Sequence, residues 1–141
     1  RHPERFQEVA NLLEKKRIAF CKWNQKRKEE SLILVDVMGQ LSHCFAVSSL
    51  ALVAGSFSSR VGGHNIWEPC SYGCPVLFGP HMHAQKELVE WILNAGAGKQ
   101  VVLSEIVSVV EKELKEPSLS CKKISSQKIS ERVMNLIFNE D

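Results

Sequence analysis

The chain has 141 residues, of which 44% are hydrophobic and 24% charged, and its formal net charge is +2. This composition predicts one globular domain with enough apolar chain for a core, and it excludes a disordered segment. So small a net charge gives no support for nucleic acid as a partner, and no apolar run approaches the ~20 residues of a membrane-spanning helix.

The N-terminal region is predicted to form a helix followed by a strand. Pro3 suits the first turn of a helix. Apolar residues recur at helical spacing to about Lys16, namely Phe6, Val9, Ala10 and Leu13. Ile18–Trp23 is a short strand candidate. A charged loop at 24–31 follows. Basic residues cluster in this region, at Lys15, Lys16 and Arg17 and then at Lys22, Lys26, Arg27 and Lys28. This cluster is interpreted as a solvated face, with attraction to an anionic membrane surface as the alternative.

The next segment is predicted to be a strand, a turn and a helix. Leu32–Val35 is an apolar run typical of a buried strand. Asp36–Gly39 forms the turn, and the helix runs from Gln40 to Val47. Met38 and Gly39 would then lie at the carboxyl end of a strand, where ligands bind in open α/β sheets. Met38 is also the kind of residue that fills a core.

A glycine-rich stretch lies between two further apolar runs, Leu50–Val53 and Pro75–Phe78, both predicted to be buried strands. Asn65 is a good N-cap for a short helix over Ile66–Tyr72, with Glu68 in its first turn. A helix N-terminus suits a phosphate, and a carboxylate there can accept hydrogen bonds from a ribose diol. The alternative is an ordinary βαβ connection with a tight turn.

The glycines of this stretch, Gly55, Gly62 and Gly63, would let the backbone approach a ligand closely. The loop also offers hydroxyls and a cation that could contact a sugar carboxylate, on Ser56, Ser58, Ser59 and Arg60. For Arg60 a mobile surface cation is an equal alternative. Ile66 and Trp67 are interpreted mainly as residues that pack the helix down.

The remainder continues the alternation of helices and strands. We predict a helix over about Gln85–Leu93, a strand over Gly98–Val102, and a helix from Leu103 to Lys115 that Pro117 ends. A final helix spans about 129–137. This alternation favours an α/β fold, a Rossmann-like parallel sheet flanked by helices.

The five cysteines do not form a recognisable metal motif. They are Cys21, Cys44, Cys70, Cys74 and Cys121. Cys70 and Cys74, together with His81 and His83, fit no common zinc spacing. We therefore predict reduced thiols and no metal.

Three segments resemble the Kdo (3-deoxy-D-manno-octulosonic acid) transferases of lipopolysaccharide synthesis. GGHNIWEP followed by PVLFGPH is similar to one family segment, the opening RHPERF to a second, and DVMGQL to a third. All three occur in the family's order and spacing, and the resemblance runs from Arg1 to about Gly98. It implies the C-terminal, donor-binding half of a GT-B glycosyltransferase.

The resemblance also implies a CMP-binding site. It assigns to this site Arg1, Met38, Gly39, Gln40, Asn65, Ile66, Trp67 and Glu68. Arg1 would contact the donor phosphate or nucleotide. Gln40 departs from the family's glutamate, so it keeps an acceptor oxygen without the charge. No catalytic residue is expected in this chain, because the family's general base belongs to its N-terminal domain.

The implied function is transfer of Kdo from CMP-Kdo to a lipid A precursor, and to further Kdo, at the cytoplasmic face of the inner membrane. We expect residues 1–141 to be a fragment that lacks the acceptor domain, a membrane anchor and the first part of its own sheet, and to be inactive alone. CMP-Kdo is the donor substrate, and no cofactor is expected. Two alternatives are the donor domain of a GT-B transferase that uses a UDP-sugar, and a non-catalytic nucleotide-binding module.

Overall fold

The computed structural model describes residues 3–25 and 32–124. The chain divides into two compact units, Arg1–His43 and Cys44–Asp141, and each is described by itself. Within the described ranges, no helix combines the length and the apolar character needed to cross a membrane.

Within its described residues, the first unit contains one complete helix, the start of a second and a two-stranded parallel sheet. A 3-10 turn at Pro3–Arg5 leads into α1, Phe6–Lys15, which confirms the predicted helix. β1, Cys21–Lys22, pairs with β2, Ile33–Leu34. Both strands are shorter than predicted, and the prediction that 32–35 is buried is wrong. Leu32 is exposed and the rest is half-buried, because β2 is an edge strand of a two-stranded sheet in its own unit.

Asp36 joins the carboxyl ends of the two short strands. Its carboxylate accepts a hydrogen bond of 3.2 Å from the backbone N–H of Trp23 and forms an ion pair of 3.9 Å with Lys22. The turn predicted at 36–39 follows, and α2, Leu41–Val47, begins one residue later than expected. The sequence therefore predicted this segment closely.

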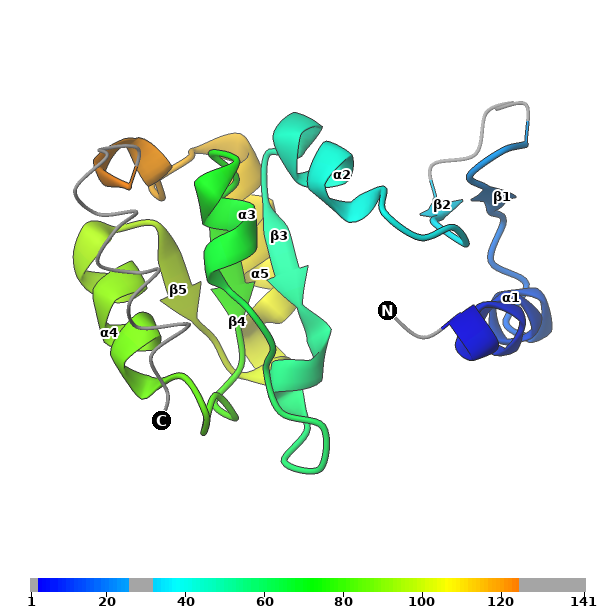
Figure 1. Cartoon of the computed structure of the whole chain (residues 1–141), viewed down its shortest axis with the longest axis horizontal. Coiled ribbons are helices and arrows are strands. Elements are labelled where there is room, and N and C mark those ends of the chain that lie inside the picture. The colour runs from blue at the N-terminus through cyan, green and yellow to red at the C-terminus, as the bar shows by residue number, and fades with distance from the viewer. Residues whose placement is uncertain (1–2, 26–31, 125–141) are drawn as a thin grey trace. The chain divides into compact units, whose positions relative to one another are not determined.

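The second unit contains a three-stranded parallel sheet in the order β3-β4-β5 (Figure 1). Its strands are Ala51–Val53, Val76–Phe78 and Gly98–Gln100. The helices are α3, Trp67–Ser71, α4, Lys86–Ala95, and α5, Ile106–Lys115. α3 and α4 cover one face of the sheet and α5 lies on the other. Every one of these elements overlaps a predicted one, and the α/β fold with parallel strands is confirmed.

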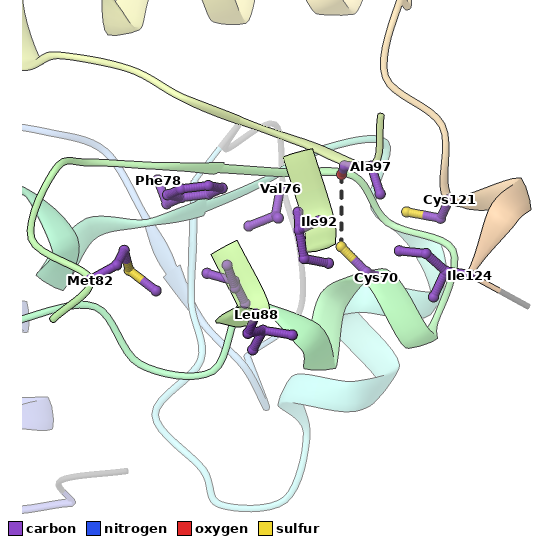
Figure 2. Close-up of a cluster of buried hydrophobic side chains, with 10 residues drawn as sticks. Cys70, Val76, Phe78, Met82, Leu88, Ile92, Ala97, Cys121 and Ile124 are labelled. Atoms are coloured by element: carbon purple, nitrogen blue, oxygen red, sulfur yellow. Dashed lines mark hydrogen bonds between the residues drawn. The ribbon is translucent and has the colours of Figure 1, made fainter. Parts of the chain in front are cut away.

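The core of the second unit lies between β4 and the α3–α4 layer (Figure 2). β4 is buried along its whole length. Its sequence is therefore a continuous apolar run and does not alternate between apolar and polar residues. From α4, Leu88 and Ile92 reach the core at the i, i+4 spacing of one helix face. The other members of the cluster are Ile66, Cys70, Met82, Ala97, Cys121 and Ile124.

The predicted helix over 103–115 is present as a 3-10 turn, Leu103–Glu105, followed by α5. Its apolar stripe is largely exposed in this unit, with Leu103 at 72%, Val107 at 70% and Leu114 at 59%. Pro117 follows the end of α5, as predicted. The helix predicted at 129–137 lies outside the described residues.

Glu113 holds the chain in place after α5. Its buried carboxylate accepts hydrogen bonds from the Ser118 hydroxyl at 2.6 Å and from the backbone N–H groups of Ser118 and Leu119 at 2.9 and 3.2 Å. Burial raises the pKa of this carboxyl, but the three hydrogen bonds and the charge of Lys99 outweigh it, so the pKa lies below its ordinary value.

We expect Glu113→Gln to lower the free energy of unfolding at neutral pH. Because the folded-state pKa is lowered, the carboxylate's contribution is present above the unfolded pKa of ~4.3 and is lost as the pH falls through the folded pKa. Urea unfolding at pH 7 and at a series of lower pH values should therefore show the gap between variant and wild type closing in acid. A gap that stays constant down to pH ~3 would contradict this role.

Candidate functional site

The candidate site in the second unit lies at the carboxyl edge of its sheet, where the connections leave β3 and β4. β3 continues into a 3-10 turn, Ala54–Phe57. Ser56 belongs to this turn, and its side chain is fully buried. The Ser56 hydroxyl donates to the Val53 carbonyl and accepts a hydrogen bond of 2.6 Å from the backbone N–H of Gly79. Ser56 therefore joins the ends of the two strands, and the prediction that it contacts a sugar carboxylate is wrong.

Two backbone hydrogen bonds extend this connection. The N–H of His81 donates to the Ser56 carbonyl at 2.9 Å, and the N–H of Gly63 donates to the His81 carbonyl at 2.7 Å. The loop after β3 and the loop after β4 thus form one hydrogen-bonded unit. His81 is fixed within it at both its N–H and its C=O.

The glycines of this region serve the close approach of these two loops. A Cβ at Gly79 would lie 2.5 Å from the backbone oxygen of Ser56, and a Cβ at Gly63 would overlap the sulfur of Met82. A Cβ at Gly55 would lie 2.7 Å from the backbone oxygen of Gly62. The packing of the protein on itself accounts for these glycines, so they are not evidence of a ligand.

The start of α3 is capped by Asn65, as predicted. Its side-chain oxygen accepts hydrogen bonds from the backbone N–H groups of Trp67 at 2.9 Å and Glu68 at 3.2 Å. Two of the N–H groups that the sequence analysis offered to a phosphate are therefore already bonded. An anion at this helix start would need other donors.

The three residues after Asn65 differ in how much surface they offer. Ile66 is fully buried, which speaks against a direct ligand contact. The indole of Trp67 packs on Trp91, with ring centroids 5.1 Å apart and planes tilted by 57°, so it packs the helix down as interpreted. Glu68 lies in the first turn of α3 and is half-buried. Among these three, Glu68 is the one suited to a ligand.

The other predicted CMP contacts belong to the first unit. Met38 is 56% exposed, so it is not the core filler that its residue type suggests. Gly39 has φ +80°, a conformation that favours glycine, and Gln40 is half-buried just before α2. Arg1 lies outside the described residues. The two groups of predicted contacts are in different units, so the structure describes each group separately.

Two histidines that the sequence analysis considered only as metal ligands lie at the same edge of the second unit. His81 is half-buried and His83 is exposed, and their ring centroids are 5.6 Å apart. A signal for them was present in the sequence, because both lie in the loop that follows a predicted buried strand, where binding residues gather in α/β folds.

Across the described part of the chain, no three His, Cys, Asp or Glu side chains gather in a way that could hold a metal ion. Cys70 and Cys121 lie together in the core, and the Cys70 thiol donates to the Ala97 carbonyl at 3.7 Å (Figure 2). The hydrogen bond between the two thiols and burial raise the pKa of Cys70, and burial raises the pKa of Cys74 to about 11. The thiols of Cys70 and Cys74 are packing groups, and their raised pKa values keep them protonated at neutral pH.

Comparison with known proteins found relatives in sequence and a similar fold. No family model matches the chain. A 3-deoxy-D-manno-octulosonic acid transferase from Chlamydophila psittaci is 38% identical over 119 residues, which cover 83% of this chain and 28% of that protein. The enzyme of the same name from Aquifex aeolicus is 39% identical over 95 residues, covering 62% of this chain and 26% of that protein.

A solved structure has a similar fold. It is the crystal structure of the C-terminal CMP-Kdo binding domain of WaaA from Acinetobacter baumannii. The TM-score is 0.75 at 24% identity, and the match covers 98% of this chain and 70% of that one. This likeness confirms the predicted fold class. The chain spans about a quarter of the length of the curated relatives it matches.

The close packing at Gly79 gives a test by paired substitution. Gly79→Ala should lower the free energy of unfolding by about 2–3 kcal/mol, because the new methyl group meets rigid backbone. Gly73→Ala, where φ is +81° and no atom lies within 4 Å, should cost only the backbone strain of ~1 kcal/mol. Urea denaturation measures both. Equal losses would contradict the close approach of the two loops.

The cap at Asn65 can be tested by a second pair of substitutions. Asn65→Ala removes the acceptor for two N–H groups and should cost ~1 kcal/mol of stability. Asn65→Asp keeps an acceptor in the same place and should cost less. Thermal and urea unfolding would distinguish them, and a loss in Asn65→Asp as large as in Asn65→Ala would show that the cap is not the reason.

Proposed function

We propose that this chain, which is related in sequence to the 3-deoxy-D-manno-octulosonic acid transferases over 83% of its length, is the donor-binding part of a Kdo transferase. The observation that carries the proposal is the 38% identity to the Chlamydophila psittaci enzyme, over a region whose fold is also that of a CMP-Kdo binding domain. The reaction is transfer of Kdo from CMP-Kdo to a lipid A precursor in lipopolysaccharide synthesis.

The donor's nucleotide is assigned to two short segments. In the second unit, Glu68 accepts hydrogen bonds from the ribose diol, and Asn65 holds the first turn of α3 so that this carboxylate is correctly placed. In the first unit, Met38 and Gly39 offer an exposed turn at the end of β2 to the nucleotide. Gln40 and Arg1, which also belong to the first unit, are assigned to nucleotide binding on the resemblance alone.

The chemistry divides between this chain and the rest of the enzyme. Transfer to an acceptor hydroxyl requires a base that removes its proton, and a leaving CMP requires cations or N–H groups that stabilise its phosphate. We assign stabilisation of the leaving phosphate to this chain, and removal of the acceptor proton to another domain. No residue here is given a catalytic role, and no metal is required by the assignment.

The remaining parts of the proposal concern the acceptor and its location. A lipid A precursor is embedded in a bilayer by its acyl chains, so its transferase works at a membrane surface, here the cytoplasmic face of the inner membrane. Lys15, Lys16 and Arg17, at and after the C-terminal end of α1, are exposed cations that would favour an anionic surface. Arg17 adopts φ +55°, which places a non-glycine residue in the turn that leaves the helix.

Titration of the purified chain with CMP, UMP and a UDP-sugar tests the assignment. Calorimetry should show binding of CMP in preference to UMP and the UDP-sugar. Preference for the UDP-sugar would indicate a different transferase. Equal binding of all three would indicate a general nucleotide-binding module.

Glu68→Gln tests the ribose contact within the same experiment. The substitution keeps size and shape but removes the charge, so CMP binding should weaken about tenfold while the melting temperature changes little. Glu111→Gln, on the exposed side of α5, is the matched control and should leave binding unchanged. Normal CMP affinity in Glu68→Gln would leave Glu68 as an ordinary carboxylate of a first helical turn.

A further inference from the structure

The anionic part of the sugar nucleotide needs N–H or O–H groups that donate hydrogen bonds to it. Two of the N–H groups expected to do so are already bonded within the protein. The N–H groups of Trp67 and Glu68 are bonded to the Asn65 side chain. The Ser56 hydroxyl is buried and bonded to Val53 and Gly79. The donors for a phosphate or a sugar carboxylate must therefore come from other residues at this edge.

His81 is held next to the start of α3. The hydrogen bond of 2.7 Å from the Gly63 N–H to the His81 carbonyl places the backbone of His81 beside a residue only two positions before Asn65. The bond from the His81 N–H to Ser56 fixes it from the other side. A residue held at both its N–H and its C=O presents its side chain from a defined position, as a binding residue must.

The imidazoles of His81 and His83 carry nitrogen atoms that are available for a ligand. Their ring centroids are 5.6 Å apart, close enough for both rings to contact one anionic group. Within residues 3–25 and 32–124, neither ring makes a hydrogen bond or ion pair. Arg60 and His64 are both exposed on the loop that His81 contacts. They add a guanidinium and an imidazole to this edge of the sheet, and neither is a carboxylate that would repel an anion.

We propose that His81 and His83 form the anion-binding part of the donor site, donating hydrogen bonds to an anionic group of the nucleotide-linked sugar acid. Both a phosphate and a carboxylate offer paired acceptor oxygens that match two neighbouring N–H donors. The proposal rests on the proposed function, because it takes the ligand to be a CMP-linked sugar acid. It adds two residues to the site and gives them a defined partner.

The experiment compares three ligands: cytidine, which has no anionic group, CMP, which has a phosphate, and CMP-Kdo, which has a phosphodiester and a sugar carboxylate. Calorimetry on the 141-residue chain would measure their affinities for wild type, His81→Ala and His83→Ala. We expect each substitution to weaken binding of CMP-Kdo by about fivefold to tenfold and to leave cytidine unchanged. His81→Gln, which keeps an N–H donor, should recover part of the loss.

Comparison of CMP with CMP-Kdo shows which of the two anionic groups the histidines contact. An equal loss for CMP and CMP-Kdo would assign the pair to the phosphate, and a loss confined to CMP-Kdo would assign it to the sugar carboxylate. Lys112→Ala, which removes a cation from the last turn of α5 at the opposite edge of the sheet, is the control for long-range charge and should have no effect.

Three results would overturn the proposal. Unchanged affinity for both CMP and CMP-Kdo in the two histidine variants would show that the pair does not bind the anion. An equal loss of affinity for cytidine would show that the histidines have a structural role. A lowered melting temperature of the same variants would support that conclusion. Failure of wild type to bind any of the three ligands would remove the proposed function as well, so the two failures are distinguishable.

Discussion

The hydroxyl of Ser56 is the contact on which the carboxyl edge of the second unit depends. It is fully buried, it donates to the carbonyl at the end of β3, and it accepts from the N–H just after β4. Loss of such a group would leave two buried backbone groups without partners, which costs more than the net value of one hydrogen bond. The hydrogen bonds through His81 and Gly63 extend from this point, and so the loops before α3 and after β4 keep a fixed relation.

The start of α3 is consequently a stable structural element rather than an open anion site. Asn65 satisfies the N–H groups of the first turn, and Trp67 anchors the turn against Trp91. A helix of five residues needs such support, because isolated short helices are unstable in water. An anionic ligand at this helix start would therefore have to be bound by other groups, because Asn65 already bonds the N–H groups of Trp67 and Glu68.

The sequence predicted what local chemistry determines. The apolar runs gave the strands, helical spacing gave α1, α4 and α5, and Asn65 was recognised as a cap because its partners are two and three residues away. The role of Ser56 was missed because its partner Gly79 is 23 residues distant and becomes a neighbour only when β3 and β4 pair. The glycines were assigned to a ligand for the same reason, since Met82 and Ser56 approach them only in the folded chain. Met38 was expected more in a core than on the surface, and residue type alone could not decide it.

The two groups of predicted nucleotide contacts differ in a way that bears on how the donor is recognised. The turn at Met38 and Gly39 has exposed side-chain surface and a glycine at φ +80°, and the Asp36 side chain that precedes it is bonded to Trp23 and Lys22, which fixes the turn from below. It offers backbone groups and a flexible thioether, which suit a flat base more than a charge. In the proposed function, the edge of the second unit supplies the Glu68 carboxylate for the ribose and the imidazoles of His81 and His83 for anionic oxygens. Gln40, just after the turn at Met38 and Gly39, departs from the glutamate of the similar family segment. A neutral amide there keeps an acceptor oxygen but carries no negative charge, so a role that requires an anion at this position is not available to this chain.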